Sequence, residues 1–165
     1  MLDYYDAIAE IAPSSLAPDL SGTVKFLDTD GGTWVEAEIF GLPEFMEGDA
    51  THPQIGPFGF HIHENAICGE QFSDEPFTAA GAHWNPTDQP HGNHAGDLPS
   101  LFSNDGVAKM LFFTNKFKPK DVINKTVIIH QSPDDFQTQP SGKSGKRIGC
   151  GTIVASELAE DFTNI

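Results

Sequence analysis

Residues 23–39 read TVKFLDTDGGTWVEAEI, and this stretch predicts two antiparallel strands joined by a tight turn. Polar and apolar side chains alternate over residues 23–26 and 35–39, which is the period of a strand with one buried face. Asp30-Gly31-Gly32 lies between the two runs, and such a cluster is typical of a hairpin turn. We therefore expect a β-sheet that includes this hairpin.

Further strands are expected after the hairpin, where apolar runs are bounded by turn residues. They cover residues 58–63, 107–113, 126–130 and 147–154. We expect less regular structure at the two ends of the chain. Residues 3–12 are predicted to form a short amphipathic helix or to lie along the surface, and residues 156–165 to form a short helix or to be disordered.

Two long stretches, residues 64–99 and 131–146, show neither the two-residue period of a strand nor the period of a helix. Both are rich in Gly, Pro, Asn, Asp and Ser. Loops of this length inside a compact domain are usually functional. Each begins directly after a strand that ends in histidine. The layout predicts an all-β protein, a small antiparallel barrel or sandwich with two long functional loops.

The composition limits the classes of partner. The chain has 165 residues, the length of one domain, and a formal net charge of −15. This charge argues against nucleic acid and against an anionic membrane surface as partners. No apolar run is long enough for a membrane span, and no signal peptide is recognisable. A complete chain would then be cytoplasmic, and a chain with a trimmed N-terminus periplasmic or secreted.

The chain has two cysteines, Cys68 and Cys150. They are too far apart in sequence for the closely spaced thiolate pairs of a zinc site. Spacing alone leaves two readings: one disulfide that closes a long loop, or two unrelated buried thiols.

Six of the seven histidines form an ordered series together with one aspartate. The series is His61, His63, His83, His91, His94, Asp97 and His130. Scattered surface and core histidines are the alternative interpretation, but the clustering favours metal ligands, because imidazole suits zinc and copper.

The positions of these residues suggest two groups of donors. In His61-Ile62-His63 both imidazoles share one face of a strand, and His130 at the end of another strand can supply a third nitrogen. The loop residues His83, His91, His94 and Asp97 offer three nitrogens and a carboxylate, the usual set of a closed zinc site. Asp97 could instead be a solvated turn residue.

Four motifs resemble the copper/zinc superoxide dismutase family, over about residues 22–154. They are GFHIHE at 59–64, GAHWNP at 81–86, HAGDLP at 94–99 and GKRIGCG at 145–151. The residues around HIHEN and AGDLPSL are more similar to the bacterial branch of this family than to the animal branch. The resemblance implies a Greek-key, immunoglobulin-like barrel over residues 22–155, with an N-terminal extension at 1–21 and a tail at 156–165.

The resemblance also implies residue roles. Copper would bind His61, His63, His83 and His130, and zinc would bind His83, His91, His94 and Asp97, with His83 shared. Asp134 would accept hydrogen bonds from His61 and His91. Arg147 would face the copper and attract the anionic substrate, although a structural ion pair is the alternative. Cys68 and Cys150 would form the family's disulfide.

The resemblance implies that the protein is an enzyme, a superoxide dismutase, which converts superoxide to O2 and H2O2 on a copper ion. Its catalytic residues would be His83 and Arg147. A non-catalytic copper-binding or copper-delivery module, or a zinc-stabilised structural protein, is the alternative. The resemblance leaves a homodimer and a copper chaperone open as partners.

This sequence departs from the animal enzymes in two places. Only Gly92-Asn93 separates His91 from His94, which could change the zinc geometry. The second loop lacks a Glu-rich stretch and offers Lys143 and Lys146 instead. Lys146 could guide an anion, whereas Lys143 is better read as a solvated charge.

Overall fold

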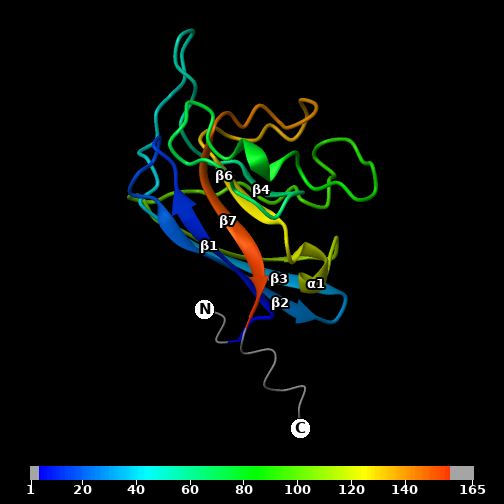
Figure 1. Ribbon diagram of the computed structural model, residues 1–165. Coiled ribbons are helices and arrows are strands. Elements are labelled where there is room, and N and C mark those ends of the chain that lie inside the picture. The colour runs from blue at the N-terminus through cyan, green and yellow to red at the C-terminus, as the bar shows by residue number, and fades with distance from the viewer. Residues whose placement is uncertain (1–3, 157–165) are drawn as a thin grey trace.

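The computed structural model describes residues 4–156, and within them the chain folds into seven strands of one antiparallel sheet (Figure 1). The strands are β1 (Ala7–Pro13), β2 (Ser21–Thr29), β3 (Gly32–Phe40), β4 (Phe60–His63), β5 (Ala108–Thr114), β6 (Thr126–His130) and β7 (Arg147–Ala155). The two short helices are η1 (Thr78–Ala80) and α1 (Pro119–Val122), neither of which the sequence predicted. The all-β prediction is confirmed.

The β2–β3 hairpin has the predicted turn. Thr29 pairs with Gly32, so the turn consists of Asp30 and Gly31. Gly31 has φ 82°, a left-handed conformation that glycine adopts without a steric penalty and that tight hairpins require. On the inner face, Val24 and Phe26 of β2 face Ala37 and Val35 of β3 and are fully buried.

The N-terminal strand β1 corrects the prediction of a helix or surface segment over residues 3–12. It pairs with β2 on one side and β7 on the other. Ala7, Ala9 and Ile11 are its buried residues, so the period is that of a strand. This part of the expected extension therefore belongs to the sheet. The domain limits at residues 22 and 155, as limits of independent folding, stay a prediction.

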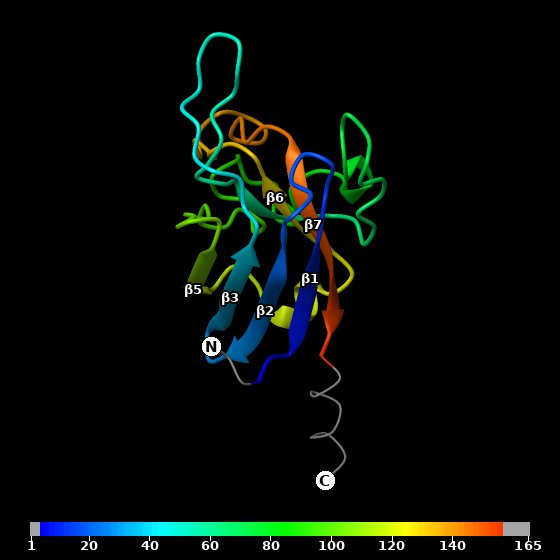
Figure 2. The same ribbon diagram turned by 90° about the vertical axis from the view of Figure 1, so that its left-hand side faces the viewer.

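The strand order is β4-β6-β7-β1-β2-β3-β5. The chain crosses over after β3, because β4 pairs with β6 at the other end of the order and β5 then returns to pair with β3. Figure 2 shows β1, β2 and β3 side by side, with the hairpin around the Met46–Ile55 bridge projecting beyond the barrel.

At the other end of the order, β4 is flanked by irregular chain rather than by a strand. Phe58 bridges to Leu101, and His61 bridges to Asp97. The backbone N–H of Leu98 also donates to the carbonyl of Phe60 (3.2 Å). The curled sheet is thereby continued past β4 by the segment 97–101.

The long irregular stretches predicted over residues 64–99 and 131–146 are present, and the first contains the single turn η1. No helix among residues 4–156 is long and apolar enough to cross a membrane. The prediction for the tail, apart from Ser156, falls outside the described residues.

Candidate metal centre

The histidines of β4 and β6 are directed by the two-residue period of a strand. Phe60 and Ile62 pack into the main core, so His61 and His63 project from the opposite face of β4. His130 ends β6 at an irregularity in its pairing with β7, where it lies opposite Arg147. All four residues of β4 are buried, because the long loops cover the face that carries the histidines.

The first loop brings its donors to this face by pairing with β4. His83 bridges to His63, and the N–H of Trp84 donates to the carbonyl of Ile62 (2.8 Å). The N–H groups of Gly92 and His94 both donate to Asp97 Oδ2 (2.8 and 3.0 Å). Asp97 Oδ2 thus holds the turn together, and Oδ1 remains available as a candidate metal ligand.

The donors form two clusters that share His83. The first contains His61, His63, His83 and His130, and the second contains His83, His91, His94 and Asp97. Within each cluster the candidate ligand atoms lie within 4.8 Å of one another. The short step from His91 to His94, which we expected could change the zinc geometry, does not keep the loop donors apart.

The spacing inside the second cluster fits a tetrahedral ion. Nδ1 of His83, His91 and His94 lies 3.1, 3.2 and 3.3 Å from Asp97 Oδ1. Ligand atoms around a tetrahedral zinc ion, bound at about 2.0–2.1 Å, are separated by about 3.3 Å. The buried Nδ1 atoms of His91 and His94 make no hydrogen bond among the described residues, which is the state of a nitrogen arranged for a metal.

Hydrogen bonds to other acceptors set which ring nitrogen is free. His63 Nδ1–H donates to the carbonyl of Gly81 (2.9 Å), and His130 Nδ1–H donates to that of Gly145 (3.1 Å). These bonds leave the Nε2 lone pairs of both rings toward the first cluster, where the two atoms are 3.4 Å apart. In the described structure, the buried Nδ1 of His61 and Nε2 of His83 have no hydrogen-bond partner.

Asp134 joins the two clusters. Its Oδ2 accepts from His61 Nε2–H (2.7 Å) and its Oδ1 from His91 Nε2–H (2.8 Å). A carboxylate only accepts, so both rings carry their proton on Nε2 and turn Nδ1 toward the clusters. The Asp134 side chain is fully buried between them.

Burial favours the neutral form of His61, His63 and His130. It lowers the pKa of His61 and His63 well below the ordinary value, and nearby His130 lowers both further. Burial also lowers the pKa of His130 to about 3. For Asp97 burial acts to raise the pKa, but the His83 hydrogen bond and the neighbouring imidazoles bring it to about 2. Neutral imidazoles and an ionised carboxylate are the forms that bind a metal.

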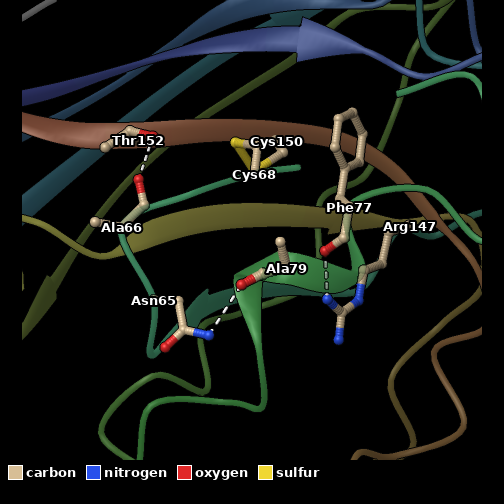
Figure 3. Close-up of a disulfide and its surroundings, with 8 residues drawn as sticks. All are labelled: Asn65, Ala66, Cys68, Phe77, Ala79, Arg147, Cys150 and Thr152. Atoms are coloured by element: carbon tan, nitrogen blue, oxygen red, sulfur yellow. Dashed lines mark hydrogen bonds between the residues drawn. A yellow bond between two sulfur atoms is a disulfide. The ribbon is translucent and has the colours of Figure 1, made fainter. Parts of the chain in front are cut away.

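Arg147 is held beside the first cluster, in the wall of a cavity that reaches its histidines. Its Nη1 donates to the carbonyl of Phe77 (2.6 Å; Figure 3). Its Nη2 donates to the carbonyl of Gly81 (2.7 Å). It lines a cavity of about 630 Å³ together with His63, His83 and His130. Burial lowers its pKa, yet a guanidinium stays charged at any neutral pH.

The predicted disulfide is present. Cys68 and Cys150 are bonded, with their Cα atoms 5.9 Å apart (Figure 3). They pack with Phe77 and Ile128 in a small second core. The bridge ties the first loop to β7. Phe77, which packs against this disulfide, also provides one of the carbonyls that bind Arg147. The disulfide therefore helps to hold a residue that positions Arg147.

Three residues near the clusters were missed by sequence reasoning. Gln139 bonds both backbone groups of His91, and the Lys116 ammonium donates to the carbonyl of His94 (3.0 Å). The carbonyl of Gly81 holds both His63 and Arg147. Lys146, considered as an anion guide, instead donates to the carbonyl of Asp74 (2.8 Å) and lies 3.4 Å from Glu75.

An antiparallel barrel with two buried donor clusters that share one imidazole defines a protein built for two metal ions. The model of the family "Copper/zinc superoxide dismutase (SODC)" matches residues 20–153. The superoxide dismutase [Cu-Zn] of Deinococcus radiodurans is 35% identical over 90% of this chain and 89% of that protein. That of Legionella pneumophila is 32% identical over 90% of this chain and 86% of its own.

A solved structure agrees with this assignment. The crystal structure of a double mutant of a SOD-like protein from Bacillus subtilis has a TM-score of 0.70 and 26% identity, covering 89% of this chain and 96% of that one. The chain belongs to the copper/zinc superoxide dismutase family, as the sequence predicted, and bacterial proteins are among its relatives.

Proposed function

We propose that this protein is a superoxide dismutase that converts two superoxide anions and two protons to O2 and H2O2. The proposal is supported by family membership and above all by one observation. His61, His63 and His130 of the first cluster and His91 of the second each have one ring nitrogen engaged by a carbonyl or by Asp134, and the other ring nitrogen faces the other donors of its cluster. Such an arrangement leaves the donors ready for metal without reorganisation.

The donor chemistry assigns the metals. The first cluster, with four nitrogens from His61, His63, His83 and His130, would hold copper, for which imidazole is a suitable ligand. The second, with three nitrogens and the Asp97 carboxylate, matches the closed set of a zinc site. Copper, when bound, supplies the alternate one-electron oxidation and reduction of superoxide.

His83 is the residue positioned to move a proton. Its Nδ1 faces the second cluster and its Nε2 faces the first. In the proposed cycle, Nε2 takes up a proton in one half-reaction and gives it to the reduced substrate in the other. The second cluster holds the Nδ1 side throughout, so the ring returns to the same place.

Arg147 is the residue positioned to attract the substrate. It lines the cavity that reaches His63, His83 and His130, and two carbonyls fix its guanidinium there. A fixed cation in a cleft raises the rate at which an anion arrives, by about 10–10³-fold in known cases. Lys146 is turned toward Asp74 and Glu75, and so contributes less.

Metal analysis followed by an activity assay tests the function. The native protein should contain copper and zinc, about one of each, and superoxide should decay rapidly by pulse radiolysis. Copper without accelerated decay would favour the copper-binding or copper-delivery module instead. Zinc without copper, and no activity after copper loading, would leave the zinc-stabilised structural protein.

A further inference from the structure

The turn between His91 and His94 is short, and it is held by Asp97 of its own loop and also by the second loop. The N–H of His91 donates to Gln139 Oε1 (2.8 Å), and its carbonyl accepts from Gln139 Nε2 (3.2 Å). One amide side chain therefore engages both backbone polar groups of a residue in the second cluster. These two bonds orient the peptide groups on either side of His91, and with them the direction in which the imidazole leaves the chain.

The packing around this contact leaves little freedom. A Cβ added to Gly92 would lie 2.3 Å from the carbonyl oxygen of Phe136. A Cβ on Gly142 would lie 1.8 Å from Asp134 Oδ1 and 2.6 Å from His91 Nε2. The second loop thus contacts the backbone next to His91 through Phe136 and the His91 ring through Gly142, so a small rotation of His91 would disturb its hydrogen bond to Asp134.

Gln139 itself is placed by its own loop. Its Nε2 also donates to the carbonyl of Gln137 (3.2 Å). Asp135 accepts from the N–H groups of Gln137 and Thr138 (2.9 and 2.7 Å), and the N–H of Gly142 donates to the carbonyl of Thr138 (2.7 Å). The segment that presents Gln139 is therefore an ordered turn, although the side chain lies near the surface.

We propose that Gln139 is a positioning residue for the second cluster. It holds the His91 backbone so that Nδ1 faces His83, His94 and Asp97 while Nε2–H stays on Asp134. The proposal rests on the proposed function only in taking this cluster as a metal site. It gives the second loop a part in zinc binding beyond that of Asp134.

Cobalt(II) binding by the metal-free protein tests the proposal, because tetrahedral Co²⁺ has visible absorption that reports its geometry. Gln139→Ala should weaken Co²⁺ and Zn²⁺ binding at this cluster about ten-fold and alter the Co²⁺ spectrum. Gln139→Glu keeps an acceptor for the His91 N–H and loses the donor, so it should fall between. Gln137→Ala is the matched control, because that exposed side chain is replaced while the carbonyl that Gln139 uses remains.

The readouts separate positioning from general stability. We expect Cu²⁺ affinity at the first cluster and the melting temperature of the metal-free Gln139→Ala protein to match the wild type. Unchanged Co²⁺ affinity and spectrum in Gln139→Ala would overturn the proposal. Equal losses at both clusters, with a lower melting temperature, would also overturn it. If the wild type bound no Co²⁺, the proposed metal site itself would fail.

Discussion

Asp134 accepts hydrogen bonds from histidines of both clusters while belonging to neither of them. Its two oxygens bond His61 and His91, and its Oδ1 also accepts from the N–H of Phe136 (2.7 Å). The carboxylate fixes the proton of each ring on Nε2, which is the nitrogen that faces away from the clusters. A change at this single residue consequently affects two metals.

Asp134→Asn should weaken binding of copper and zinc about 10–100-fold, because an amide has one acceptor oxygen for two N–H donors. The ring that meets the amide NH2 is driven to place its proton on Nδ1, the atom needed for metal. Competition with a coloured chelator measures both affinities. Asp88→Asn, an exposed change in the first loop, is the control. Wild-type affinities in Asp134→Asn would contradict this role.

Arg147→Ala should retain both metals and react with superoxide about ten-fold more slowly at low ionic strength, because the cavity loses a fixed cation. The difference from wild type should shrink as salt is added and charges are screened. Pulse radiolysis over a salt series measures this, with Lys146→Ala as the neighbouring control. Equal rates for Arg147→Ala and wild type at low salt would reject the guiding role.

The disulfide acts at the scale of the elements, because it joins β7 to the first loop across 82 residues of chain. Replacing both Cys68 and Cys150 with serine should lower the free energy of unfolding of the metal-free protein by up to about 4–5 kcal/mol, mainly by freeing the unfolded chain. Urea titration of the metal-free proteins measures the loss. A loss below about 1 kcal/mol would show that the bridge constrains little.

Most strands could be predicted because they either alternate polar and apolar residues or are short apolar runs bounded by turn residues. The segment predicted at residues 126–130 coincides with β6, and those at 35–39 and 147–154 fall within β3 and β7. β1 was missed because Ala7–Pro13 is rich in alanine, which favours helices, and only its place between β2 and β7 selects the strand. Such tertiary selection leaves little trace in a local pattern.

The candidate site was predictable where side chains themselves bind metal. The series from His61 to His130 carries its own chemistry, so the donor sets could be proposed before the fold was known. The support could not be predicted in the same way. The carbonyls of Gly81 and Gly145 act through backbone that every residue has, and Gln139 acts through a contact between two loops.

For the whole molecule, the net charge and the proposed substrate have the same sign. The chain carries −15 at neutral pH, and superoxide is an anion. At physiological ionic strength the Debye length is about 8 Å, so distant carboxylates have little influence at the cavity. The potential that the substrate meets is set by Arg147 and by whatever metal the two clusters hold.

The buried imidazoles also make the stability of the metal-free molecule depend on pH. His61, His63 and His130 have folded-state pKa values below the unfolded value near 6.5, and that of His130 is about 3. Below pH ~6.5 the unfolded chain therefore binds more protons than the native one, and the unfolding free energy falls. The stability that depends on these neutral rings is therefore present above pH ~6.5 and is lost as the pH falls below it.

We expect the metal-free protein to lose about 1.4 kcal/mol per pH unit for each imidazole that stays neutral in the fold, from pH ~6.5 downward. Urea unfolding at a series of pH values measures the slope. The metal-loaded protein should change less over the upper part of this range, because bound metal competes with protons. A flat profile for the metal-free protein would contradict the buried, neutral state of these rings.

The segment 97–101 has a second consequence, which concerns solubility. It covers the backbone of β4, which would otherwise be the outermost strand at that end of the sheet. Exposed strand edges are templates for pairing with other chains. Since Asp97 belongs to both this segment and the second cluster, a metal bound there also fastens the cover over the edge. Loss of metal should therefore favour self-association, through a strand edge that the loaded protein keeps closed.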